Sequence, residues 1–159
     1  MQRRPSPMQS YYAARAGEYD RIYQKPERQS DLRRIEGWLP PLLSGATVLE
    51  VACGTGYWTR VIAPLASTVV AIDSAPETLQ VARQRVSAAN VVFQVGDAYA
   101  LAEIGRSFDG AFAGFWFSHV PLVRQHEFLS GLNAALTPGA RVVLLDNVFV
   151  EGSSSAIAV

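Results

Sequence analysis

The stretch ATVLEVACGTGYWT, residues 46–59, decides the fold of this chain. Its apolar, β-branched first half predicts a short buried strand that ends near an acidic residue, Glu50. A glycine turn, Gly54-Thr55-Gly56, follows and opens an amphipathic helix. Glycine suits this turn because the backbone needs unusual angles and because a side chain would keep a ligand away from the main chain. The stretch therefore predicts a strand, a turn and a helix that together form a nucleotide-type ligand site.

Two further strands are expected to bring carboxylates to the same place. Residues 68–72 form an apolar run that ends at Asp73, and residues 91–95 form another that leads to Asp97. In a doubly wound parallel sheet the loops after neighbouring strands meet at the carboxyl edge. With two more strands at residues 108–114 and 140–146, the chain is expected to form a Rossmann-like, mostly parallel α/β sheet in three layers. Asp73 is then placed to bind ribose hydroxyls.

Two classes of ligand fit this arrangement, a dinucleotide such as NAD and the methyl donor S-adenosylmethionine (SAM). A dinucleotide fingerprint has a third glycine three residues after the second, and Thr59 occupies that position. The Glu50 carboxylate would repel a pyrophosphate, but it would attract the ammonium and sulfonium groups of SAM. The residues therefore favour SAM over NAD.

At this point the sequence resembles the class I SAM-dependent methyltransferases, in particular the small-molecule, Rossmann-like branch. The resemblance rests on five blocks in order, VLEVACGTGYWT, VVAIDSAPETLQVAR, VVFQVGDAY, FDGAFAGFWFSHV and LTPGARVVLLDN. Ala52 departs from the pattern because many relatives carry glycine there. The resemblance implies transfer of a methyl group from SAM to a small-molecule acceptor by in-line displacement, with S-adenosylhomocysteine (SAH) as the product.

The resemblance also implies which residues bind SAM. Tyr11, Tyr12 and Arg15 are expected to bind the methionyl carboxylate or to shape the substrate pocket, although an amphipathic helix that packs its tyrosines on the sheet is an equally good interpretation. Asp73 is expected at the ribose and Asp97 at the adenine amino group. The alternatives are a plain surface carboxylate for Asp73, a loop cap for Asp97 and, for Glu50, a carboxylate that only binds neighbouring backbone amides. The full predicted set is Glu50, Ala52, Gly54, Gly56, Asp73, Ser74, Asp97, Ala98, Phe115, Tyr11 and Arg15.

One residue is a candidate for catalysis, and no residue is a candidate for metal binding. His119 follows the fourth expected strand and is placed to act as a general base, or else it only caps the next helix. Tyr57 and Trp58 are expected either to line the acceptor entrance or to pack the helix after the glycine turn. Cys53 has no second cysteine or histidine at metal-ligand spacing, so no metal is expected.

Composition and charge are consistent with one domain. At 159 residues with 49% hydrophobic content, the chain can bury about 70% of its unfolded surface. We expect a helical cap at residues 1–40, the Rossmann-like core at 46–150 and a loose tail at 151–159. A net charge of zero argues against a nucleic-acid partner or a membrane-surface partner. The lone cysteine and the absence of a signal peptide or a long apolar run predict a cytoplasmic protein.

The expected helices carry recognisable boundaries. Residues 9–38 are predicted to be helical with a break at Lys25-Pro26. Ser74 and Glu77 form a capping-box pattern for a helix that runs to about Ala88. A further helix is expected to begin near Pro121.

The C-terminus is shorter than the resembling family requires. Members of that family usually continue with further strands after the fifth, and here these strands are missing, so the fifth strand would lie at an open edge. Truncation is the favoured explanation, ahead of a strand supplied by another subunit in a homodimer and a naturally minimal protein. Two alternatives to an active methyltransferase remain, a SAM-binding module without turnover and, less favoured, an NAD-dependent oxidoreductase.

Overall fold

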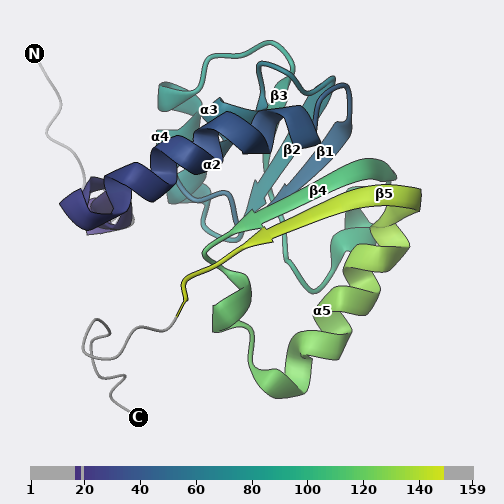
Figure 1. Ribbon diagram of the computed structural model, residues 1–159. Coiled ribbons are helices and arrows are strands. Elements are labelled where there is room, and N and C mark those ends of the chain that lie inside the picture. The colour runs from purple at the N-terminus through teal and green to yellow at the C-terminus, as the bar shows by residue number, and fades with distance from the viewer. Residues whose placement is uncertain (1–16, 19, 149–159) are drawn as a thin grey trace, which may run out of the picture.

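The computed structural model describes residues 17–18 and 20–148, and these residues build a parallel five-stranded sheet (Figure 1). The strand order is β3-β2-β1-β4-β5, and all four pairings are parallel. The strands are β1 (Thr47–Val51), β2 (Thr68–Asp73), β3 (Val91–Val95), β4 (Phe108–Gly114) and β5 (Leu136–Leu145). The order reverses between β1 and β4, as a doubly wound sheet requires. The predicted Rossmann-like fold is confirmed.

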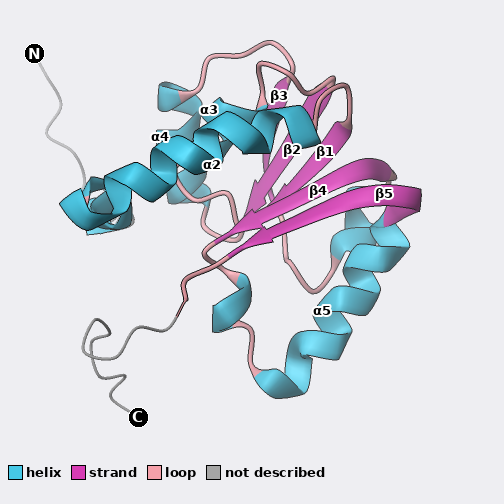
Figure 2. Cartoon of the chain, in the orientation of Figure 1, coloured by secondary structure: helices cyan, strands magenta, loops and turns pink. Residues whose placement is uncertain are grey.

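Helices cover both faces of the sheet, with α5 on the side opposite to α2, α3 and α4 (Figure 2). On one side are η1 (Pro26–Arg28), α2 (Gln29–Leu42), α3 (Tyr57–Ile62) and α4 (Pro76–Arg85). On the other side are η2 (Leu101–Ile104), η3 (Phe117–His119) and α5 (Leu122–Ala135). No described helix combines the length and the apolar character that a membrane span needs.

The central strand β1 is buried on both faces, which explains why its residues are apolar on both faces apart from Glu50. Val48 packs into the core on the α2 and α3 side, and Leu49 and Val51 pack into the core on the α5 side. Parallel strands covered on both sides have this continuous pattern. The sheet therefore holds the carboxyl end of β1, where the glycine turn begins, between two packed cores.

Two helix boundaries differ from the sequence-based expectation. The first is α2, which continues beyond Trp38 to Leu42 and includes Pro40 and Pro41. Burial of Leu39 and Leu43 against the sheet keeps this last turn helical, so tertiary packing overrides the proline signal.

The second is α4, where the capping box was wrong. Ala75 is the N-cap residue, and no side chain caps the helix. Instead, the backbone N–H of Ala75 donates a 3.0 Å hydrogen bond to Asp73 Oδ1. The helix ends at Arg85, because Val86 adopts an extended conformation and is buried, and not near Ala88.

The fifth strand is longer than expected and lies at an edge of the sheet. It begins at Leu136, directly after α5, and not at Ala140. An irregularity in register between Phe108 and Gly110 absorbs the extra length. Pairing of this edge with another strand or a second copy stays a prediction, as do the domain boundaries at residues 40, 46 and 150.

Candidate functional site

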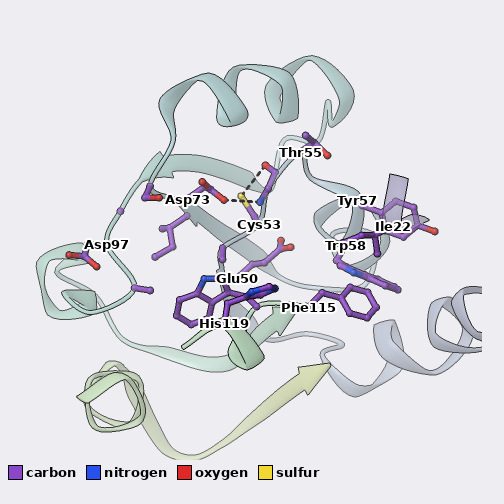
Figure 3. A pocket seen from close by; sticks show the side chains of 18 of the residues that line it. Ile22, Glu50, Cys53, Thr55, Tyr57, Trp58, Asp73, Asp97, Phe115 and His119 are labelled. Atoms are coloured by element: carbon purple, nitrogen blue, oxygen red, sulfur yellow. Dashed lines mark hydrogen bonds between the residues drawn. The ribbon is translucent and has the colours of Figure 1, made fainter. Parts of the chain in front are cut away.

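A cavity of about 500 Å³ opens at the carboxyl edge of the sheet, where the loops after β1, β2, β3 and β4 meet (Figure 3). Ile22 and Tyr23, from the helical segment at residues 20–24, close one side of it. Nine of the residues predicted from the sequence line this cavity, namely Glu50, Ala52, Gly54, Asp73, Ser74, Asp97, Ala98, Phe115 and His119. The parallel topology therefore brings together residues that lie far apart in the sequence.

The glycine turn contributes main chain to the cavity through Gly54. Gly54 has a φ of +56°, and a Cβ built on it would meet no atom within 4 Å. Gly56 differs from the expectation because it does not line the cavity. A Cβ on Gly56 would lie 3.0 Å from Val86 Cγ2, so this glycine allows the start of α3 to lie against the end of α4.

Ala52 occupies a position where many relatives carry glycine. Its φ of +54° lies in the left-handed region, which glycine adopts more easily than alanine. An L-residue in the left-handed region carries about 1–2 kcal/mol of strain, and glycine does not. We expect Ala52→Gly to raise the free energy of unfolding by up to about 1 kcal/mol, because the relief of strain is partly offset by the greater unfolded-state entropy of glycine. Urea unfolding of the two proteins measures the difference. A less stable variant would show that Ala52 is not strained.

Asp73 connects β2 to the glycine turn. Its Oδ2 accepts a 3.0 Å hydrogen bond from the backbone N–H of Gly54, and its Oδ1 accepts one from Ala75 N–H. The carboxylate is partly buried and lines the cavity. Asp73 is therefore more than a plain surface carboxylate, because it holds the main chain of two ligand-facing loops in place.

Glu50 is the most buried acidic group of the cavity, with 1% of its surface exposed. The hydroxyl of Thr59 donates a 2.5 Å hydrogen bond to Glu50 Oε2. Burial raises the pKa of Glu50 to about 8, against a smaller opposing effect of the Thr59 hydrogen bond. Thr59 occupies the position where a dinucleotide-binding fingerprint has its third glycine. In this protein the residue at that position donates a hydrogen bond to the buried Glu50.

Asp97 lies at the end of the cavity away from Trp58 (Figure 3). Its Oδ1 accepts a 2.8 Å hydrogen bond from the backbone N–H of Tyr99. This contact is the loop cap that was the alternative to adenine binding. The second carboxylate oxygen forms no hydrogen bond with the described part of the chain, and Asp97 is exposed, so the loop cap leaves an acceptor available at the cavity.

Aromatic side chains form the opposite end of the cavity. Tyr23 and Tyr57 stack with ring centroids 3.9 Å apart, and Tyr23 meets Trp58 edge-on at 6.0 Å. Tyr23 also meets Phe115 at 6.0 Å. Tyr57 and Trp58 therefore pack α3 against Tyr23 and also line the cavity. Both roles considered for these two residues are present in the structure. Electron-rich ring faces of this kind attract cations.

Phe115 carries backbone strain at the end of β4. Its φ is +54°, which is unusual for a bulky residue and typically found where function or packing demands it. A 2.7 Å hydrogen bond from Phe115 N–H to the Leu145 carbonyl holds this conformation. The end of β5 therefore supports the loop that carries the aromatic wall.

His119 is exposed at the cavity and lies in η3. It does not cap the following helix, because α5 begins at Leu122 with Pro121 as its N-cap residue. The neighbouring Ser118 donates from its backbone N–H and its hydroxyl to Asp146, both at 2.8 Å. Asp146 and Ser118 therefore position η3, and with it His119, relative to β5.

Cys53 has the properties of a small buried side chain. It lines the cavity but is 8% exposed, and burial raises the pKa of its thiol above the usual range. Within residues 17–18 and 20–148, no group of three or more His, Cys, Asp or Glu side chains is arranged to hold a metal ion.

Asp20 is a residue of this region that sequence reasoning missed. It accepts two hydrogen bonds from Arg85, at 2.8 and 2.7 Å, and one from the Thr55 hydroxyl at 3.0 Å. These contacts connect the N-terminal segment to α4 and to the glycine turn. No local pattern relates residues so far apart, so the sequence contained no signal for this contact. Tyr11, Tyr12 and Arg15 lie outside the described residues.

The fold and this cavity define a Rossmann-like α/β protein with a nucleotide-type ligand site. Comparison with known families agrees, since the family model described as "Methyltransferase domain" matches residues 48–139, more than half of the chain. The chain therefore belongs to the class I SAM-dependent methyltransferase family.

Curated relatives include several quinone methyltransferases. The chain is 34% identical over 124 residues to 2-phytyl-1,4-naphtoquinone methyltransferase of Thermosynechococcus vestitus, covering 76% of this chain and 53% of the relative. It is 31% identical over 109 residues to demethylmenaquinone methyltransferase of Shouchella clausii, covering 65% and 46%. The chain thus spans about half the length of the curated relatives it matches.

Solved structures show the same fold. A complex of DhpI with SAH superimposes with a TM-score of 0.73 at 34% identity, covering 87% of this chain and 66% of that one. A putative methyltransferase from Haloferax volcanii, bound to its Trm112 activator, gives a TM-score of 0.67 at 20% identity. It covers 89% of this chain and 61% of that one, and it supports the fold alone.

Proposed function

We propose that this protein transfers a methyl group from SAM to a small-molecule acceptor. The observation that carries the proposal is the meeting of Glu50, Gly54 and Asp73 in one cavity at the carboxyl edge of the sheet. The likeness to a SAH-bound protein at 34% identity supports the choice of ligand. The protein that contains this chain would then release SAH and the methylated acceptor.

The residues present fit SAM. The open space above the Gly54 main chain admits a ligand in direct backbone contact, and the free lone pairs of the Asp73 carboxylate suit two vicinal ribose hydroxyls. Glu50 offers a carboxyl group to an ammonium, and the faces of the aromatic side chains Tyr23, Trp58 and Phe115 suit a sulfonium. Ser74, Ala98 and Asp97 would contact the adenosine portion. When bound, SAM supplies an activated methyl group.

The contribution of the chain to the reaction is mainly positioning. Asp73 and the Gly54 main chain orient the ligand, and the ring faces at the opposite end exclude water from the reacting atoms. Holding two reactants in a near-attack arrangement can lower a barrier by about 7–11 kcal/mol in favourable cases. We propose His119 as the general base where the acceptor is a hydroxyl, because its imidazole lines the cavity.

A second candidate function is SAM binding without turnover, which shares the same cavity residues and differs only in whether SAH is formed. An NAD-dependent oxidoreductase is less well supported. Thr59 replaces the third glycine, and the buried Glu50 would face the pyrophosphate.

Calorimetric titration with SAH, with NAD as a control, tests the proposed ligand. We expect binding of SAH and no binding of NAD. Formation of SAH from SAM in the presence of an acceptor then separates an enzyme from a binding module. Demethylmenaquinone and 2-phytyl-1,4-naphthoquinone are the first acceptors to test, since two curated relatives are named for them. Binding of NAD without SAH would refute the proposal.

A further inference from the structure

Asp20 joins the helical segment at residues 20–24 (the lid segment) to two other elements at the rim of the cavity. Its carboxylate accepts hydrogen bonds of 2.8 and 2.7 Å from the guanidinium of Arg85, the last residue of α4. It also accepts a 3.0 Å hydrogen bond from the hydroxyl of Thr55, which is buried in the glycine turn. One carboxylate therefore holds the lid segment against both α4 and the glycine turn.

The lid segment brings Ile22 and Tyr23 to the cavity, two and three positions after Asp20. Asp20 and Arg85 do not themselves line the cavity, so this ion pair acts on it only through the position of the lid segment and of the glycine turn. Movement of the lid segment away from α4 would withdraw Ile22 and Tyr23 and open that side of the cavity.

The ion pair between Asp20 and Arg85 combines directional hydrogen bonds with access to solvent. Each terminal guanidinium nitrogen meets one carboxylate oxygen, the bidentate arrangement that fixes both side chains. The hydrogen bonds from Arg85 hold the pKa of Asp20 below its usual range, so the carboxylate is ionised at neutral pH. The side chain of Arg85 is 47% exposed and that of Asp20 is 16% exposed. Water and salt therefore weaken the pair, which opens without unfolding the sheet.

We propose that the ion pair between Asp20 and Arg85 holds the lid segment closed over the cavity, and that opening of this pair controls how fast SAM and SAH enter and leave. The identity of the ligand in this inference rests on the proposed function. Asp20 and Arg85 are positioning residues, since neither touches the ligand. The pair forms between side chains of the protein alone, so the same opening step precedes both entry and release.

Association and dissociation rates of SAH, measured by surface plasmon resonance, test the proposal. SAH has no sulfonium charge, so salt affects its own attraction to the protein only slightly. We expect Asp20→Asn to raise both rates by roughly 3- to 10-fold, the range for loss of a partly exposed bidentate ion pair, and to change the Kd by less than about twofold. Glu127→Gln is the matched control. It also removes one negative charge and one ion pair, that with Arg124 on α5, and it should leave both rates unchanged.

Salt and charge reversal test the ion pair itself. In the unmodified protein, an increase in ionic strength from about 0.05 to about 0.5 M should raise both rates by roughly two- to fivefold, because screening weakens a partly exposed pair. The rates of Asp20→Asn should not respond to salt. Arg85→Asp alone should accelerate exchange of SAH. Asp20→Arg in the same chain should restore slow exchange and its dependence on salt.

Alkylation of Cys53 measures opening of the lid segment without any ligand. Cys53 is the single cysteine of the chain, lines the cavity and is 8% exposed. Its reaction with iodoacetamide therefore requires local opening. In ligand-free protein, we expect alkylation to be roughly 3- to 10-fold faster in Asp20→Asn than in the unmodified protein or in Glu127→Gln.

Three kinetic results would overturn the proposal. These are unchanged rates in Asp20→Asn, faster dissociation with unchanged association, and failure of charge reversal to restore slow exchange. The second result would mean that Asp20 only strengthens the bound state. Failure of the unmodified protein to bind SAH would instead refute the proposed function. The alkylation rates then decide the role of the ion pair, and equal rates in Asp20→Asn and the unmodified protein would show that it does not close the lid segment.

Discussion

The free energy of unfolding of the ligand-free protein is expected to fall by on the order of 3–5 kcal/mol as the pH rises from about 4.5 to about 8. The cause is Glu50, whose burial raises its pKa from 4.5, the ordinary value for an exposed glutamate, to about 8 in the folded protein. Between these two values the folded protein binds more protons than the unfolded chain. The stability that the protonated Glu50 side chain contributes is fully present below about pH 4.5 and is lost as the pH rises through about 8.

Urea unfolding at a series of pH values measures this effect, and Glu50→Gln is its control. Glutamine keeps the shape and an acceptor for the Thr59 hydroxyl, but it does not ionise. The difference in stability between Glu50→Gln and the unmodified protein should therefore grow as the pH rises. A constant difference from pH 5 to pH 8 would show that Glu50 is ionised in the folded protein at neutral pH.

Asp73→Ala is expected to lower the affinity for SAH by about 1–3 kcal/mol, which corresponds to roughly 5- to 150-fold. The substitution removes the acceptor for the backbone N–H groups of Gly54 and Ala75. It also removes the carboxylate that we propose for the ribose. Gly54 then loses its hydrogen bond to the end of β2 at the place where the ligand contacts the main chain.

Asp109→Ala is a matched control for Asp73→Ala. Asp109 Oδ1 accepts a 2.6 Å hydrogen bond from the backbone N–H of Thr47, at the amino end of β1 and away from the cavity. Both substitutions should lower stability, whereas only Asp73→Ala should lower the affinity measured by calorimetry. Unchanged SAH affinity in folded Asp73→Ala protein would contradict a role for Asp73 in the site.

Long-range contacts account for what the sequence could not predict about the site. The strand ends at Glu50, Asp73 and Asp97 were predictable because apolar runs and the following acidic residues are local patterns. The hydrogen bond from Gly54 N–H to Asp73 joins the loops at the ends of two strands. The contact between Asp20 and Arg85 joins two helices whose residues lie 65 positions apart. Neither contact leaves a signature in the neighbouring sequence.

Gly54 and Gly56 show the same limit within a single turn. Their spacing predicted a ligand-binding loop, yet only the packed structure shows that Gly56 faces Val86 while Gly54 faces the cavity. What a side chain at either glycine would meet depends on which helix lies beside the turn. That helix, α4, comes from a later part of the chain.

By itself the sequence determined the parallel α/β fold, the family and most of the residues at the carboxyl edge, because periodicity and turn residues act over a few neighbouring positions. Only the tertiary structure decided the burial of Glu50, its hydrogen bond to Thr59 and the hydrogen bond from Gly54 N–H to Asp73. Desolvation and hydrogen-bond satisfaction depend on everything that surrounds a group in space, and those surroundings exist only once the sheet and its two helical layers have packed together.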